Sequence, residues 1–291
     1  MPPAVGEPVR GRAAPGTAGG SAVRCTAYLA VNNHMGAIMR VWFVILASVL
    51  IGGAAGAQTP AEHIALGDSI FARFKPDEAL PHYIAAIGPD SSNYEALWKA
   101  ARSEIDLAEA ERDPARRDQY SKSGEALSRR AIRVNARDPE GHFNLARALG
   151  RRALSVGVRD RIKFATEVRA EALEALRYNA DHPGALHVLG VWNAEVMRIN
   201  GVSRFLAKNV LGGRVFGEAS WDNAVKYMER AVAVDPDRIV HHLDLAKIYD
   251  DVGDKAKARA QFELVVRGRR TDFSDPAYQR EAQAALDKMK D

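Results

Sequence analysis

Cysteine is almost absent from this sequence. Cys25 is its only cysteine in 291 residues, which excludes an internal disulfide framework and any metal site built from several thiolates. Long apolar runs are scarce as well. The run Val41–Ile51 has 11 residues, too few to cross a hydrocarbon core of about 30 Å unaided. A membrane-spanning anchor is therefore the less favoured interpretation of this run.

The sequence also lacks the common signatures of catalysis and cofactor binding. It contains no Gly-x-Gly-x-x-Gly motif, no phosphate loop ending in Gly-Lys-Ser/Thr and no Gly-x-Ser-x-Gly elbow. No two histidines stand at i, i+4, the helical spacing that presents both rings to one metal. His241 and His242 are adjacent, so we expect a partly exposed pair on a helix face. We predict a protein that is not an enzyme and that holds no metal and no cofactor.

No strong excess of one charge remains after the first 57 residues. The chain carries 41 Lys+Arg and 37 Asp+Glu, a formal net charge of +4. Four arginines and one glutamate in residues 1–57 supply +3 of this charge, so residues 58–291 carry +1. Arginine clusters in that part have acidic neighbours and no interleaved aromatic rings, unlike a groove for single-stranded nucleic acid. We therefore predict no nucleic-acid partner.

Residues 1–57 have the layout of a leader. Met39-Arg40 precedes the apolar run, and the small residues Gly52–Ala57 follow it. A positive start, an apolar segment and an Ala-x-Ala-like end are typical of a secretory signal peptide. We predict cleavage before Gln58, which also removes Cys25.

The first 38 residues do not fit an ordinary signal peptide, so we interpret them as an upstream extension. A true start at Met35 or Met39 would give a signal of normal length. The mature chain is then periplasmic or secreted, as in bacterial export. If residues 41–51 are not cleaved, they would instead anchor the chain, and we expect no other membrane contact.

The remainder of the chain has the pattern of helices. Residues 58–291 are rich in Ala, Leu, Glu and Arg, with apolar residues at helical spacing and no alternating β-branched runs. Proline follows a residue that can cap a helix at several points, as expected at helix starts. These predicted starts are Lys75-Pro76, Asp113-Pro114, Asp138-Pro139, His182-Pro183, Asp235-Pro236 and Asp275-Pro276. We predict about a dozen helices and no strand.

Two distant stretches share one pattern of small and aromatic residues. Gly67 is followed twelve residues later by Ala79 and then by Tyr83. Ala246 is likewise followed twelve residues later by Ala258. This layout resembles the tetratricopeptide repeat, in which small residues let two helices cross closely. The predicted fold is all-α, an antiparallel helix-pair, right-handed solenoid that forms one domain over 58–291.

The middle of the chain departs from a regular repeat length. We attribute the longer second pair to a loop at 110–117, and we predict an insert at 200–220. Insertions in such arrays form loops or extra helices on one face. We expect the short helix within this insert to pack on the solenoid itself.

A narrower resemblance comes from the order of several motifs. His187–Trp192, the insert ending in Val215–Gly217 and the stretch Trp221–Ala231 occur in the order found in the regulator of microtubule dynamics family, which the sequence resembles over about 139–265. The resemblance implies a helical-repeat adaptor that is not a catalyst. We do not transfer microtubule binding, because an export signal would place this chain where there are no microtubules.

The predicted function is binding of a protein or peptide by a scaffold. The first helix of each pair lines a groove in such solenoids. Helical projection directs Arg147, Arg151, His187 and Lys247 towards that groove, and we predict that they contact the partner. The alternative is an accessory subunit of an envelope or secretion complex that binds through the convex face and the insert 200–220.

Overall fold

The structure, a computed structural model, describes residues 58–88, 92–209 and 213–289. The predicted leader, its cleavage site and Cys25 lie outside these residues. Within them there are twelve α-helices, one 3-10 helix and no strand, so the prediction of an all-α fold is confirmed. The elements are α2 (Pro60–Phe71), α3 (Pro76–Ile87), α4 (Tyr94–Ala110), α5 (Pro114–Val134), α6 (Pro139–Ala153), α7 (Val158–Tyr178), α8 (Pro183–Arg198), α9 (Gly201–Asn209), η1 (Arg214–Glu218), α10 (Trp221–Val234), α11 (Ile239–Asp251), α12 (Lys255–Arg267) and α13 (Asp275–Lys288).

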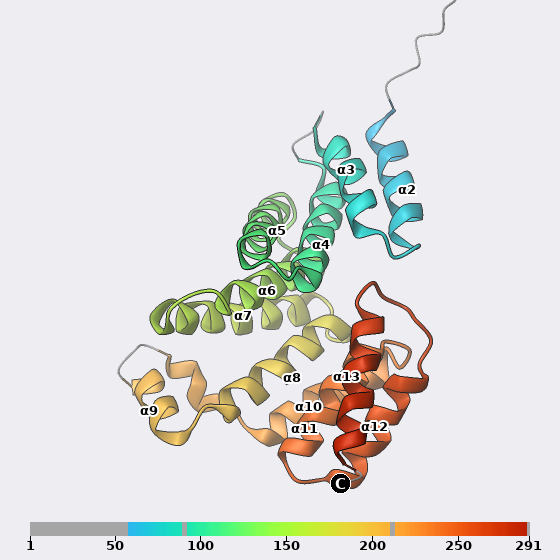
Figure 1. The fold of residues 1–291 in the computed structure, drawn as a ribbon. Helices are drawn as coiled ribbons and strands as arrows, with labels where there is room; N and C mark the ends of the chain where they lie inside the picture. Colours follow the sequence, from blue (N-terminus) through green and yellow to red (C-terminus); the bar gives the residue numbers. More distant parts are fainter. Residues whose placement is uncertain (1–57, 89–91, 210–212, 290–291) are drawn as a thin grey trace, which may run out of the picture. The chain divides into compact units, whose positions relative to one another are not determined.

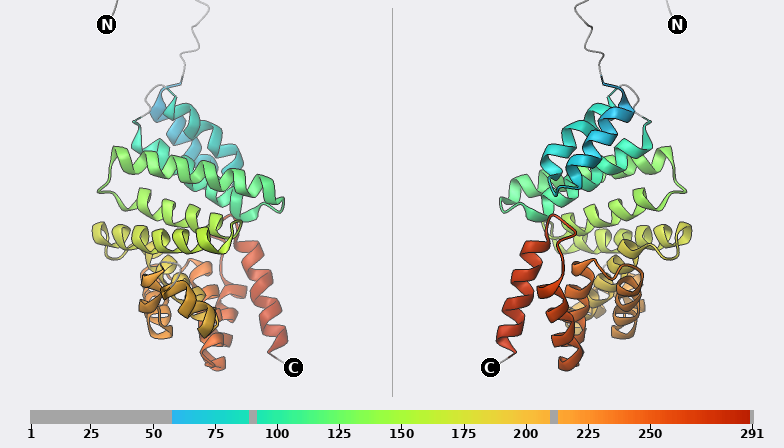
Figure 2. Two further views of the ribbon diagram at one scale, coloured as in Figure 1. Left: turned by 90° about the vertical axis from the view of Figure 1, so that its left-hand side faces the viewer. Right: turned by 90° about the vertical axis from the view of Figure 1, so that its right-hand side faces the viewer.

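The helices form antiparallel pairs that stack in chain order (Figures 1 and 2). The pairs are α2 with α3, α4 with α5, α6 with α7, α8 with α10, and α11 with α12, and α13 follows as a single last helix. The first helices α4, α6, α8, α11 and α13 also contact one another in succession. We call the surface that these five helices share the inner face.

Small residues allow the two helices of a pair to cross closely, as the repeat pattern predicts. A Cβ atom at Gly67 would lie 2.6 Å from Cε1 of Tyr83, which is itself fully buried. A Cβ atom at Gly190 would lie 2.9 Å from Cε of Met228 and 3.3 Å from the carbonyl oxygen of Ala224. Any larger side chain at these crossings would push the helices apart.

Most of the predicted helix starts are confirmed. The side chains of Asp113, Asp138 and His182 accept hydrogen bonds from backbone N–H groups in the first turns of α5, α6 and α8. The prediction at Asp235-Pro236 is wrong, because the N–H of Asp235 still donates to the carbonyl of Ala231 at the end of α10. Helix α11 begins only at Ile239.

Asp275 also differs from its predicted role as a cap. It lies inside the first turn of α13, and Ser274 precedes that turn as the N-cap residue. The Asp275 carboxylate instead accepts hydrogen bonds from the loop before the helix. The aspartate therefore shapes the connection that leads into the last helix.

The second pair is longer because its helices are long, and not because a long loop joins them. The prediction of a loop at 110–117 is wrong, since only residues 111–113 separate α4 from α5. The cap Asp113 and Pro114 at the first helical position start α5 early, and it runs for 21 residues. Helix α7 has the same length.

The insert packs on the solenoid, as expected. The ring of Phe216 in η1 is buried, with its centroid 6.0 Å from that of Trp192 on α8. A hydrogen bond of 2.9 Å from the N–H of Gly213 to the carbonyl of Ala207 joins η1 to α9. The centre of the insert, residues 210–212, lies outside the described part of the chain.

Candidate functional site on the inner face

Arg147 and Arg151 lie one helical turn apart on α6 and both meet acids of α4. Arg147 places a guanidinium nitrogen 2.7 Å from Oδ1 of Asp106 and 3.6 Å from Oε2 of Glu109. Arg151 lies 2.8 Å from the same Glu109 oxygen. The two predicted residues therefore share one carboxylate on the inner face.

Burial acts on these two carboxylates with different results. Asp106 is 4% exposed, and this burial raises its pKa even though Arg147 favours the charged form. Burial also opposes ionisation of Glu109, but the charges of Arg151 and Arg147 outweigh it and lower the pKa of Glu109. Removing Arg147 would thus leave the buried carboxylate of Asp106 without its ion-pair partner.

His187 and Lys247 form a second cluster around Asp244. Nε2 of His187 lies 3.2 Å from the Asp244 carboxylate, and Nζ of Lys247 lies 3.0 Å from its other oxygen. Lys247 also contacts Glu281 of α13 at 2.8 Å. Although burial opposes it, the hydrogen bond from His187 and the charge of Lys247 lower the pKa of Asp244.

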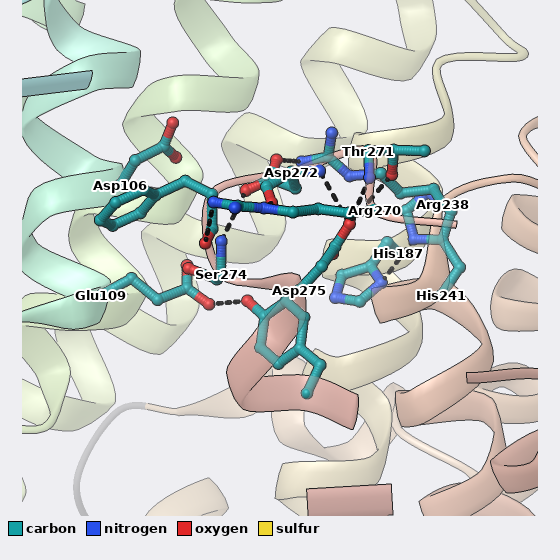
Figure 3. A network of polar contacts seen from close by, with 12 residues as sticks. Asp106, Glu109, His187, Arg238, His241, Arg270, Thr271, Asp272, Ser274 and Asp275 are labelled. Carbon is teal, nitrogen blue, oxygen red and sulfur yellow. Dashed lines mark hydrogen bonds and ion pairs between the residues drawn. The ribbon is translucent and has the colours of Figure 1, made fainter. Parts of the chain in front are cut away.

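The prediction that His241 and His242 form a partly exposed pair is wrong. They are 4% and 7% exposed, because α8 meets the ring of His241, and the α10–α11 turn and α12 meet the ring of His242. His242 contacts the carbonyl of Pro236 in that turn at 2.9 Å, whereas Nδ1 of His241 faces Nδ1 of His187 at 2.9 Å (Figure 3). Burial and the nearby His187 lower the pKa of His241 to about 2, so its ring is neutral.

The segment that leads into α13 also reaches the inner face, which the sequence interpretation missed (Figure 3). The hydroxyl of Tyr278 donates to Glu109, and Asp272 forms an ion pair with Arg238. The guanidinium of Arg270 lies 4.3 Å from the centre of the Phe74 ring. No motif in the sequence indicates these contacts, since they join residues that are 34 or more positions apart in the chain.

A cleft of about 940 Å³ opens where α8, α11, α12 and α13 approach one another. Five basic and three acidic side chains line it, together with apolar groups that include Phe262 and Met289. The charged lining residues are Arg198, Lys247, Asp250, Asp251, Lys255, Arg259, Glu281 and Lys288. Of the four predicted contact residues, Lys247 alone borders this cleft.

A family model described as regulator of microtubule dynamics protein 1-3 matches residues 68–290 of the chain. The chain belongs to this family. The match extends well beyond the stretch 139–265 on which the resemblance in the sequence rested. No sequence among the curated proteins matches the chain.

Solved structures similar to this member of the regulator of microtubule dynamics family are tetratricopeptide repeat proteins. A thermophilic one from Thermus thermophilus has 18% sequence identity and a TM-score of 0.55, and the match covers 77% of this chain and 99% of that one. PilF of Pseudomonas aeruginosa has 14% identity and a TM-score of 0.48, with 79% and 89% covered. The first of these likenesses supports the repeat fold.

The described part of this family member contains no cluster of three or more His, Cys, Asp or Glu residues that could hold a metal ion. In the same residues, no helix combines the length and the apolar character needed to span a membrane.

Proposed function

We propose that this protein is an exported, non-catalytic scaffold that binds a protein or peptide partner on its inner face. The observation that carries the proposal is the cleft between α8, α11, α12 and α13, where charged side chains stand beside the partly buried Met289. Membership of a family of tetratricopeptide-like proteins supports it. An apolar anchor surrounded by polar contacts is the usual basis of such recognition.

Lys247 is the residue best placed to exchange its partner. Its contact Glu281 is about half exposed at 52%, whereas Asp244 beneath it is 22% exposed. A carboxylate of the incoming peptide would replace Glu281, while Asp244 would keep the ammonium group in position. Arg147, Arg151 and His187 stay in the proposal as contacts that a partner reaches beneath the segment leading into α13.

Export is part of the proposal and rests on the signal-like pattern of residues 39–57. Expression of the full chain in a bacterial host, followed by N-terminal sequencing of the periplasmic protein, would test it. We expect the mature chain to begin at Gln58. A protein that stays in the cytoplasm with residues 39–57 intact would contradict export, and a membrane-bound, uncleaved chain would favour the anchor.

Site-specific crosslinking in an envelope extract tests the binding site. A photocrosslinker at Ala256, beside the cleft, is expected to capture a defined partner. Lys247→Glu should abolish this crosslink by reversing a charge at the cleft. The matched control is Lys122→Glu, which reverses an exposed charge on α5, and it should leave the crosslink intact.

The alternative partner surface is the insert 200–220, and one feature favours it. Phe205 on α9 is 64% exposed, and Leu154 at the end of α6 and Val158 at the start of α7 are exposed to a similar degree. Exposed apolar groups of this size often mark contacts with other proteins. If crosslinks arise at Phe205 and not at Ala256, the partner binds the insert and the inner-face proposal is wrong.

A further inference from the structure

Residues 268–278, which we call the strap, contact three separate parts of the repeat array. Arg270 stacks on Phe74 in the α2–α3 connection, and Asp272 pairs with Arg238 at the start of α11. Tyr278 donates to Glu109 on α4, across a separation of 169 residues. Figure 3 shows Arg270 and Asp272 of the strap in the same region as Arg238 and Glu109.

Hydrogen bonds within the strap hold it in shape independently of the face that it meets. The carboxylate of Asp275 accepts from the N–H groups of Thr271 and Asp272, each at 2.7 Å. The guanidinium of Arg270 donates to the carbonyl of Asp272 at 3.1 Å. The strap therefore presents its side chains as a preformed ligand would.

The last helix packs against other elements than those that the strap contacts in α4 and the α2–α3 connection. Helix α13 packs mainly against α12 and α11. The strap reaches α4 and the α2–α3 connection by the ends of side chains. A competitor can replace the contacts of Arg270 and Asp272 without unpacking α13. Replacing Tyr278, whose ring packs against the C-terminal hydrophobic cluster, requires only the first turn of α13 to open.

The receiving side contains one strained residue. Phe74 has a φ of +63°, in the left-handed region that bulky side chains rarely adopt. This conformation directs its ring to the Arg270 guanidinium. Strain of this kind is concentrated at ligand sites and switch regions.

The α2–α3 connection therefore offers the ring of Phe74 for a cation, and the adjoining inner face offers a guanidinium for a carboxylate and a carboxylate for a hydroxyl group. We propose that Phe74, Arg238 and Glu109 form a ligand site that the strap occupies in the free protein. The partner of this site is a peptide segment with a basic residue, an acidic residue two positions later and a tyrosine six positions after that. This inference rests on the proposed function and names the partner chemistry of the same face.

A synthetic peptide of residues 268–282 with a fluorescent label tests the proposal without knowledge of the natural partner. It is titrated up to about 1 mM against the full chain, because a tethered segment acts at an effective concentration of that order. In wild type the strap outcompetes the peptide. In the double variant Asp272→Asn, Tyr278→Phe we expect the peptide to bind about tenfold more tightly or better.

The matched control is the double variant Arg269→Ala, Arg280→Ala, which changes two exposed arginines of the same region. It should bind the peptide as weakly as wild type. Adding Phe74→Ala to the strap variant should reduce peptide binding again, since the cation loses its ring. Circular dichroism is recorded for every variant, so that binding is compared only among folded proteins.

Equal peptide binding by wild type, control and strap variant would overturn the proposal, as would binding of a scrambled peptide with the same affinity. No binding to a folded strap variant at the highest concentration would overturn it too. A failed peptide titration together with the expected crosslink at Ala256 would leave the proposed scaffold function standing. A successful titration without the Ala256 crosslink would support the ligand site under the strap and count against partner binding at the cleft.

Discussion

Two regions of the inner face differ in what surrounds equivalent basic side chains. Arg147 directly follows the buried Ala146 on α6, and Lys247 directly follows the buried Ala246 on α11. The Arg147 side chain is 19% exposed between two acids of α4, whereas Lys247 is 32% exposed at the border of an open cleft. The position in the repeat determines the direction in which a side chain points. The neighbouring helices determine whether that side chain is held in a buried ion pair or remains available to a partner.

The largest expected effect is that of Arg147→Ala. It leaves Asp106 buried without its ion-pair partner, so we expect a loss of about 3–5 kcal/mol in the free energy of unfolding. Lys247→Ala is the comparison, with a loss of about 1 kcal/mol, because Asp244 keeps its hydrogen bond to His187. Urea denaturation at neutral pH measures both. Equal losses would contradict the distinction between the two regions.

Tyr278→Phe should have an intermediate effect. The hydroxyl donates to an ionised carboxylate, so its removal is expected to cost about 1.5–3 kcal/mol. Hydrogen exchange should increase in residues 268–278 and stay unchanged at Ala258 in α12. Unchanged exchange in the strap would show that the contact does not hold the segment.

Acid should weaken the carboxylate contacts of both regions. The pKa values of Glu109 and Asp244 are lowered in the folded protein, so their stabilisation is present above the unfolded values of about 4 and is lost as pH falls towards the folded values. Asp106 acts in the opposite direction, because its pKa is raised. Its stabilising effect is greatest at low pH and is lost as pH rises through the folded value.

Stability measured between pH 6 and pH 3 would separate these contributions, since the interval spans the unfolded carboxylate values of about 4. Glu109→Gln should reduce the loss of stability on acidification. Asp106→Asn should increase the loss of stability on acidification, because the variant lacks the carboxylate whose protonation stabilises the fold at low pH. A larger loss of stability in Glu109→Gln than in Asp106→Asn would contradict the assigned directions of the two pKa shifts.

The smallest expected effect is at the open cleft. Arg198→Ala removes ion pairs to Asp251 and Glu195, whose side chains are 31% and 63% exposed. Pairs so accessible to water contribute about 0–1 kcal/mol, so thermal unfolding should barely change. A loss comparable to that of Arg147→Ala would show that the cleft is a structural element of the fold.

The fold could be predicted because close helix crossings require small residues at fixed positions in the sequence. Gly67 and Gly190 stand where a side chain would collide with the paired helix, and such positions recur at the repeat spacing. The helix starts at Asp113 and Asp138 were predictable for the same reason, since a cap depends on a few adjacent residues. Asp235-Pro236 has the same local pattern, but the continuing hydrogen bond of α10 overrides it.

The surroundings of the candidate residues could not be predicted in this way. Arg147 and Arg151 meet acids about 40 residues earlier in the chain, as the pair Arg147–Asp106 with its separation of 41 shows. The spacing of Asp106 and Glu109, which places both on one helix face, was the only local pattern that indicated a pair of acids there. The ring of His241 meets His187 of α8, 54 residues earlier, which no residue pattern revealed. The role of the four residues in partner binding stays a prediction.

The bond between Tyr278 and Glu109 changes how the array is expected to unfold. In a simple repeat array each unit touches only its neighbours, so terminal repeats can melt separately and stability is a sum of local terms. Here the last helix is joined to the second pair, across 169 residues. Opening the last helix therefore removes a contact from α4, so the unfolding of these two distant elements is expected to be coupled.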